Sequence, residues 1–124
     1  MALRLCTGKH LLSIMWNNLG NSGENQAESY LKAKGYSILV KNYKCKLGEI
    51  DLIAEKDDII VFIEVKARSN EKFGKGFEAV THKKVDKIRK VATVYLLQKK
   101  LQREVRFDVI SIDKGEITHI EGAF

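Results

Sequence analysis

Two carboxylates and a lysine, Asp51, Glu64 and Lys66, lie in two neighbouring apolar segments, EIDLIA over 49–54 and IIVFIEVK over 59–66. Carboxylate oxygens are hard ligands of the kind that Mg²⁺ prefers, and this cation completes its shell with waters and substrate phosphate. A lysine ammonium can hold a phosphoryl oxygen, or orient an attacking water and help to deprotonate it. Together these side chains suit the metal-assisted hydrolysis of a phosphodiester.

The two segments have the composition of β-strands, and the charged residues between them are expected to form the tip of a hairpin. A two-residue turn at 57–58 would place Asp51 opposite Glu64 and Glu49 opposite Lys66, all on one face of the sheet. Directly opposed Cβ atoms lie about 4.5 to 5.5 Å apart, and like charges at that distance destabilise a sheet. A divalent cation would offset the repulsion, so the pattern predicts a Mg²⁺ or Mn²⁺ site at Asp51 and Glu64.

The same spacing allows an inert interpretation, in which Glu49 and Lys66 form an ion pair and Asp51 caps the strand edge. The second segment is apolar on both faces until Glu64 and Lys66, as expected for a central strand buried between layers. Buried charges cost several kcal/mol unless they are paired, so a Glu-x-Lys there needs either a partner or a function. The residues alone leave both interpretations open.

The elements around these strands predict an α/β fold: a three-layer-like sandwich with a central mixed β-sheet of about five strands flanked by helices. A first helix is favoured over 21–35 by cap-type residues at its start and a glycine at its end. Apolar residues at a period near 3.6 indicate a long amphipathic helix after a glycine-containing loop. The other predicted elements are a strand from Tyr36, the hairpin strands 49–54 and 59–66, the helix over about 78–102, and closing strands at 105–113 and 116–120.

A chain of 124 residues is long enough for one ordinary core, so we expect an N-terminal extension over 1–20 and a single domain over 21–124. Cys6 and Cys45 have no spacing typical of a zinc site or a disulfide framework, which favours a reducing cytoplasm. The apolar run at 11–16 is too short for a membrane span, so no membrane association is expected.

The net charge of +6 indicates an anionic partner, because the excess of positive charge is concentrated in one stretch. Between residues 82 and 106 only Asp86 and Glu104 are acidic. The basic residues of that stretch are Lys83, Lys84, Lys87, Arg89, Lys90, Lys99, Lys100, Arg103 and Arg106.

The motif GEIDLIAEKDDIIVFIEVKAR resembles the core of the YraN-type family, an uncharacterised branch of the PD-(D/E)XK, restriction-endonuclease-like superfamily. GENQAESYLKAKGYSILVKNY, FGKGFEAVTHKKVDKIRKVATVYL and RFDVI resemble further parts of that family in order, so the match covers roughly residues 22 to 112. The resemblance implies a restriction-endonuclease-like fold, with Asp51 and Glu64 as metal ligands and Lys66 as the catalytic lysine.

The superfamily often adds a glutamate from the first helix. Glu24 is the better match, because similar archaeal Holliday junction resolvases would place it there, and Glu28 lies one turn later. The alternative is an exposed acidic first turn favoured by the helix dipole. Lys84 resembles a recurring lysine of the second helix, whose side chain would point toward substrate phosphate. In the alternative interpretation, Lys84 lies on a solvated face of the helix and has no role in the site.

The resemblance implies a metal-dependent nuclease acting on structured or branched DNA, and a homodimer like that of the similar resolvases. Basic side chains would contact the phosphate backbone. The alternatives are a non-catalytic nucleic-acid-binding protein that keeps the nuclease fold, and an adaptor that docks its basic helix on an acidic protein. His10, His82 and His119 have no ligand spacing and are expected to be structural or solvated. The predicted nucleic-acid-binding residues are Arg68, Lys83, Lys84 and Lys87.

Overall fold

The computed structural model describes residues 23–68 and 82–124. The predicted extension over 1–20 and the loop with Gly74 and Gly76 lie outside the described residues, as do positions 78–81, the predicted start of the second helix.

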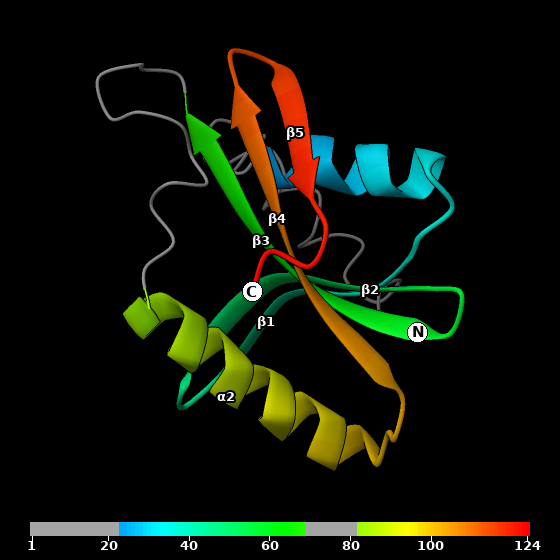
Figure 1. Cartoon of the computed structure of the whole chain (residues 1–124), viewed down its shortest axis with the longest axis vertical. Coiled ribbons are helices and arrows are strands. Elements are labelled where there is room, and N and C mark those ends of the chain that lie inside the picture. The colour runs from blue at the N-terminus through cyan, green and yellow to red at the C-terminus, as the bar shows by residue number, and fades with distance from the viewer. Residues whose placement is uncertain (1–22, 69–81) are drawn as a thin grey trace, which may run out of the picture.

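A five-stranded mixed sheet forms the centre of the molecule, in the order β1-β2-β3-β4-β5, and this confirms the predicted α/β class (Figure 1). Three neighbouring pairs are antiparallel, whereas β3 and β4 run parallel and are joined through the second helix. The elements are a first helix over 23–33, β1 (Ser37–Cys45), β2 (Gly48–Lys56), β3 (Ile59–Arg68), α2 (His82–Lys99), β4 (Glu104–Asp113) and β5 (Glu116–Ile120).

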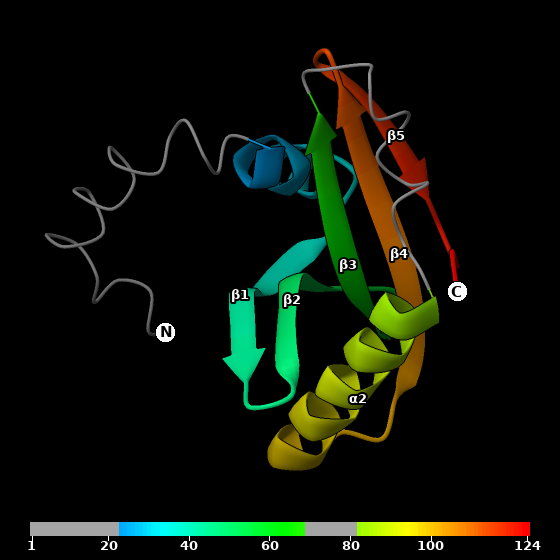
Figure 2. The ribbon, with the colours of Figure 1, turned by 90° about the vertical axis from the view of Figure 1, so that its left-hand side faces the viewer.

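The two helices cover opposite faces of the sheet, as Figure 2 shows for the first helix and α2. Ala27 and Leu31 of the first helix pack against one face, beside Val61 and Ile63 of β3. Successive strand residues point to opposite faces, so Phe62 of the same strand lies in the other cluster. That second cluster includes Ile88, Val91, Ala92 and Tyr95 of α2. Over its described residues, neither helix is long and apolar enough to cross a membrane.

The hairpin of β2 and β3 turns at Asp57 and Asp58, as predicted. Both residues have positive φ angles, 52° and 68°, the combination that a two-residue type I′ turn requires. The predicted register is confirmed from the pair of Lys56 with Ile59 to the pair of Leu52 with Ile63.

Beyond Leu52 the predicted register is wrong, because the ladder between β2 and β3 ends there. Ile50 is buried against the α2 side, on the same side as Ile53, so regular alternation is broken between these positions. The burial of Ile50 under α2 favours a bend of β2 away from β3. Glu49 consequently pairs with Lys44 of β1 and not with Lys66, so the predicted Glu49–Lys66 pair does not form.

Candidate functional site

The candidate site lies where β2 leaves β3. Past the last ladder pair, the backbone N–H of Val65 has no partner from the β2 backbone, and it donates a hydrogen bond of 2.8 Å to Oδ2 of Asp51. The side chain of Asp51 thus takes the place of the missing ladder bond and satisfies a backbone donor inside the fold. This contact holds the Asp51 carboxylate beside the C-terminal half of β3, which carries Glu64.

Glu64 is almost completely buried, with 6% of its surface exposed, and two lysines contact its carboxylate. Nζ of Lys66 lies 3.3 Å from Oε2 of Glu64. Nζ of Lys84, which comes from the first turn of α2, lies 2.6 Å from the same oxygen. The predicted proximity of Glu64 and Lys66 is therefore present, and Lys84 points into the site instead of occupying a solvated helix face.

The pKa of the Asp51 carboxyl group is strongly raised. Burial and the neighbouring charge of Glu64 raise its pKa to about 7, and the charge of Glu24 adds to this, against the opposing effects of the Val65 hydrogen bond and Lys84. Two carboxylates that share a site repel each other when both are ionised, as expected from the sequence. A cation between them would remove the repulsion.

The pKa values of the two lysines of the site, Lys66 and Lys84, are shifted in opposite directions. Burial and the hydrogen bond with Lys84 lower the pKa of Lys66, although the charge of Glu64 acts in the opposite direction. For Lys84, burial opposes ionisation, but the hydrogen bonds to Glu64 and Lys66 outweigh it and raise the pKa. The site therefore combines one lysine that stays charged with another that gives up its proton more readily.

The first helix brings Glu24 to the same end of β3. A Cβ built on Gly23 would lie 2.5 Å from Cβ of Ala67, so this glycine permits the start of the helix to approach the strand closely. Glu24 is then near enough to Asp51 to affect its pKa. Glu28, in contrast, forms ion pairs with Lys32 and with Lys41 of β1, at 3.0 Å and 3.2 Å, and takes a structural role.

Within residues 23–68 and 82–124, no group of three or more acidic, histidine or cysteine side chains is arranged to hold a metal ion. Asp51 and Glu64 are near enough for the charge of Glu64 to raise the pKa of Asp51, and Glu24 acts on Asp51 in the same direction with a smaller effect. Such a pair fits Mg²⁺, which commonly takes one or two protein carboxylates and keeps its other positions for water and phosphate.

The residues predicted to bind nucleic acid are only partly brought together. Lys83 and Lys87 are exposed on α2 and flank Lys84 on the helix surface. Arg68 ends β3, where its backbone pairs with Asp113, and its side chain lies outside the described residues. The basic stretch is less available than its composition suggests, because Arg103 is paired with Glu55, and Arg106 with Asp108.

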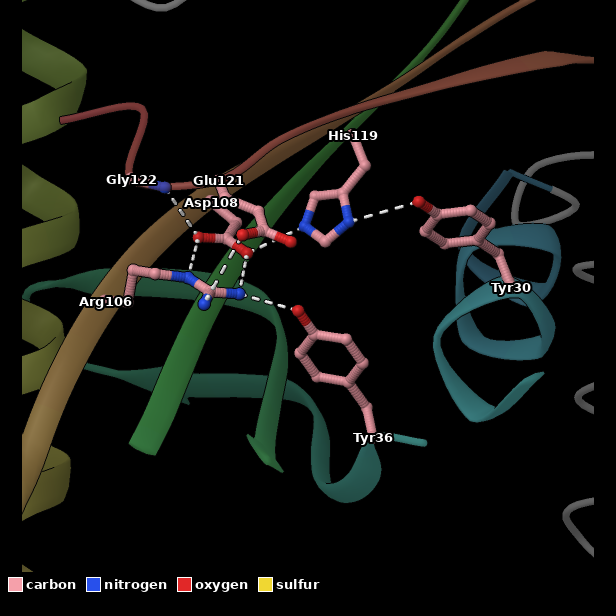
Figure 3. A network of polar contacts seen from close by, with 7 residues as sticks. All are labelled: Tyr30, Tyr36, Arg106, Asp108, His119, Glu121 and Gly122. Carbon is pink, nitrogen blue, oxygen red and sulfur yellow. Dashed lines mark hydrogen bonds and ion pairs between the residues drawn. The ribbon is translucent and has the colours of Figure 1, made fainter. Parts of the chain in front are cut away.

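A second polar cluster, shown in Figure 3, was not predicted. Its centre is Asp108, which is fully buried and accepts hydrogen bonds from Arg106, His119 and the backbone of Gly122. The sequence pattern of the closing hairpin could have predicted the contact between His119 and Asp108. A two-residue turn at 114–115 puts His119 opposite Ile110, diagonal to Asp108. The expectation that His119 is structural or solvated agrees with its buried position.

The chain matches the model of Uncharacterised protein family UPF0102 over residues 23–112. It is 48% identical over 106 residues to a UPF0102 protein of Sulfurihydrogenibium sp., covering 85% of this chain and 92% of that protein. A relative from Clostridioides difficile is 49% identical over 108 residues, covering 85% and 95% of the two chains. One from Legionella pneumophila is 42% identical over 114 residues, covering 89% and 97%.

The matched range begins at Gly23 and contains every residue of the candidate site, including Lys84 of α2. These relatives carry no description of an activity beyond the family name. The chain therefore belongs to the uncharacterised UPF0102 family, which is the YraN-type family that its motifs resemble.

Proposed function

We propose that this protein is a metal-dependent nuclease that cleaves phosphodiester bonds in structured or branched DNA. The observation that carries the proposal is the adjacent pair Asp51 and Glu64, with the pKa of Asp51 raised to about 7 beside Lys66, whose pKa is lowered. Perturbed ionisable groups held in one place are typical of catalytic sites. The likeness of the GEID and EVK motifs to the PD-(D/E)XK superfamily supports the same reaction.

Asp51 and Glu64 would hold the Mg²⁺ or Mn²⁺ ion. When bound, the cation would polarise the phosphoryl oxygens and lower the pKa of the attacking water. Asp51 is suited to this role because its carboxylate is held by Val65, and Glu64 because it is buried and cannot turn away into solvent. Glu24 would accept a hydrogen bond from a water of the site.

Lys66 and Lys84 would have different roles in the reaction. Lys66 has a lowered pKa, so it would orient the attacking water and take up its proton. Lys84 has a raised pKa, so it would keep its charge and hold a phosphoryl oxygen as negative charge develops there. Lys83 and Lys87 would contact neighbouring phosphates and provide affinity without reading the bases.

A non-catalytic nucleic-acid-binding protein is the second candidate, and the ion pairs of Glu64 favour it. Lys66 and Lys84 already offset the charge of Glu64 without a metal ion. In such a protein the cluster would be a structural ion-pair network, and binding would weaken with salt but not respond to EDTA.

The decisive measurement is cleavage of labelled duplex, single-stranded, flap and four-way-junction DNA with Mg²⁺ or Mn²⁺. We compare the wild type with Asp51→Asn and Lys66→Ala, and use Lys99→Ala, at the exposed end of α2, as the matched control. The nuclease proposal expects Lys66→Ala to lose at least about 100-fold in rate, the contribution that a general base usually makes. Asp51→Asn should lose activity at least as strongly, because it removes a metal ligand, while Lys99→Ala cleaves normally. No cleavage by the wild type, with salt-sensitive and EDTA-insensitive binding in all four proteins, would establish the second candidate instead.

A further inference from the structure

The polar cluster around Asp108 joins β4, β5 and the chain that follows β5 (Figure 3). Oδ2 of Asp108 lies 2.7 Å from Nε2 of His119 in β5 and 2.8 Å from Nη2 of Arg106 in β4. Oδ1 accepts hydrogen bonds from Nε of Arg106 at 2.9 Å and from the N–H of Gly122 at 3.0 Å. The bonds from His119 and Arg106 outweigh the effect of burial and hold the pKa of Asp108 below its usual range.

Two tyrosines extend this cluster to the first helix. Nδ1 of His119 lies 3.3 Å from the hydroxyl of Tyr30, and the two rings pack edge to face at 5.5 Å. Arg106 donates a hydrogen bond of 2.6 Å to the hydroxyl of Tyr36. Tyr30 lies in the last half of the helix, and Tyr36 follows its end. The cluster therefore holds the C-terminal part of the first helix against β4 and β5.

The opposite end of the helix carries Glu24. The helix spans residues 23–33, and Tyr30 follows Glu24 by six positions, or about 9 Å along the axis. Gly23 holds that end against Ala67 of β3, so the helix is supported at both ends. Because an α-helix of this length is stiff, a shift at the Tyr30 end changes where Glu24 lies relative to Asp51.

We propose that Tyr30, His119 and Asp108 are positioning residues, which set the place of Glu24 beside the Asp51–Glu64 pair. This role rests on the proposed nuclease function. It explains why the site-bearing helix contacts a buried His–Asp pair that makes no contact with the site itself. A hydroxyl, an imidazole and a carboxylate in fixed directions determine the helix position more closely than apolar packing does.

Tyr30→Phe is the primary test, because it removes one hydroxyl and keeps the ring against His119. Misplacing a catalytic group by about 1 Å, or removing a group that orients it, costs roughly 10- to 100-fold, so we expect kcat to fall about tenfold with KM unchanged. Tyr43→Phe is the matched control, since its hydroxyl donates a bond of 2.6 Å to Gln98 on the other face of the sheet. We expect full activity from this control.

The double variants distinguish positioning from general loss of stability. In a Glu24→Gln background, Tyr30→Phe should lower kcat no further, since it acts through Glu24. Additive losses, or a fall in stability with kcat unchanged, would overturn the role. His119→Phe, which breaks both bonds of the imidazole, should follow the same pattern with a larger effect.

A second measurement does not depend on activity. The close approach of Gly23 and Ala67 predicts a strong nuclear Overhauser effect between the Gly23 α-hydrogens and the Ala67 methyl group. We expect Tyr30→Phe and His119→Phe to weaken this signal severalfold, and Tyr43→Phe to preserve it. An unchanged signal in both variants would refute the positioning role even in a protein that cleaves DNA. A weakened signal in a protein that cleaves nothing would leave the positioning of Glu24 intact and refute only the nuclease function.

Discussion

Asp51 is the residue on which structure and chemistry depend together. Its carboxylate replaces a missing ladder bond by accepting from Val65, and it lies in the field of Glu64 and Glu24. The hydrogen bond stabilises the ionised form, whereas burial and the two acidic neighbours disfavour it. The Asp51 carboxylate is therefore fixed in position, but its ionised form is destabilised. A bound cation would reduce that destabilisation.

This balance predicts that metal-free protein loses stability as the pH rises. The pKa of Asp51 is about 7 in the folded protein against 3.8 for the free side chain, so the folded state binds more protons between those values. The free energy of unfolding should therefore fall between about pH 4 and pH 7, by on the order of 4 kcal/mol from this group. Asp51→Asn should remove that fall, because the amide oxygen still accepts from Val65 and carries no charge.

Chemical denaturation at a series of pH values in EDTA checks this expectation. The exposed Asp86 of α2 supplies a matched control, and Asp86→Asn is expected to keep the wild-type slope. The same slope in Asp51→Asn and in the wild type would mean that Asp51 is not the group responsible. Adding Mg²⁺ should flatten the wild-type slope, because a cation bound only to the folded carboxylates stabilises the folded state.

At the scale of the elements, the close contact between the first helix and β3 decides where Glu24 lies. Gly23→Ala would place a methyl carbon 2.5 Å from Cβ of Ala67, which is too close for two non-bonded carbon atoms, so the helix start must move. Alanine is the better helix former by about 1 kcal/mol, but overpacking costs about 1 to 3 kcal/mol, so we expect a net loss of stability. Cleavage should fall as well, since Glu24 moves with the helix.

The matched control for this prediction is a compensating substitution. Ala67→Gly removes the methyl group that the new side chain meets, and Ala67 is exposed, so its own loss should be small. Thermal unfolding and cleavage rates of Gly23→Ala, Ala67→Gly and the double variant are compared. A double variant that recovers neither stability nor cleavage would show that the contact with Ala67 does not limit the approach of the helix.

The strands and helices were largely predictable, because each has a local signal. The turn at 57–58 and the charge pattern around it specified the hairpin register as far as Leu52 and Ile63. The register failed at Asp51 because the alternation of β2 is broken between Ile50 and Ile53, which are both buried on the α2 side, and no local pattern indicates that burial. Asp51 still lies close to Glu64 although the register differs, because the hydrogen bond from the Val65 N–H to the Asp51 side chain replaces the ladder.

At the scale of the whole molecule, the exposed basic surface is smaller than the number of basic residues between 82 and 106 suggested. Arg106 points into the cluster of Asp108, on the side of the first helix, and Arg103 is paired with Glu55. A sequence indicates the number of charges in a stretch but not how many are used in internal ion pairs across a sheet. The exposed basic residues in the first half of α2 are Lys83, Lys87, Arg89 and Lys90.

The last prediction concerns this exposed face. Binding of a nucleic acid releases counterions, and each lysine that contacts a duplex phosphate adds about 0.9 to the slope of log K against log salt. If the substrate backbone follows α2 from Lys83 to Lys87, the variant with both lysines changed to glutamine should lose about two units of slope, and affinity should fall uniformly across DNA sequences. At saturating DNA its cleavage rate should stay near the wild-type value, because neither side chain contacts Glu64.

Fluorescence anisotropy over a range of salt concentrations measures this slope. Changing Lys99 and Lys100 to glutamine is the matched control, since it removes the same charge from the exposed last residue of α2 and the residue that follows it. Equal losses in the two double variants would indicate attraction by net charge, without a preferred path along the helix. An unchanged slope for the Lys83 and Lys87 variant would place the DNA on another face, and the approach of substrate to Lys84 along α2 would then be wrong.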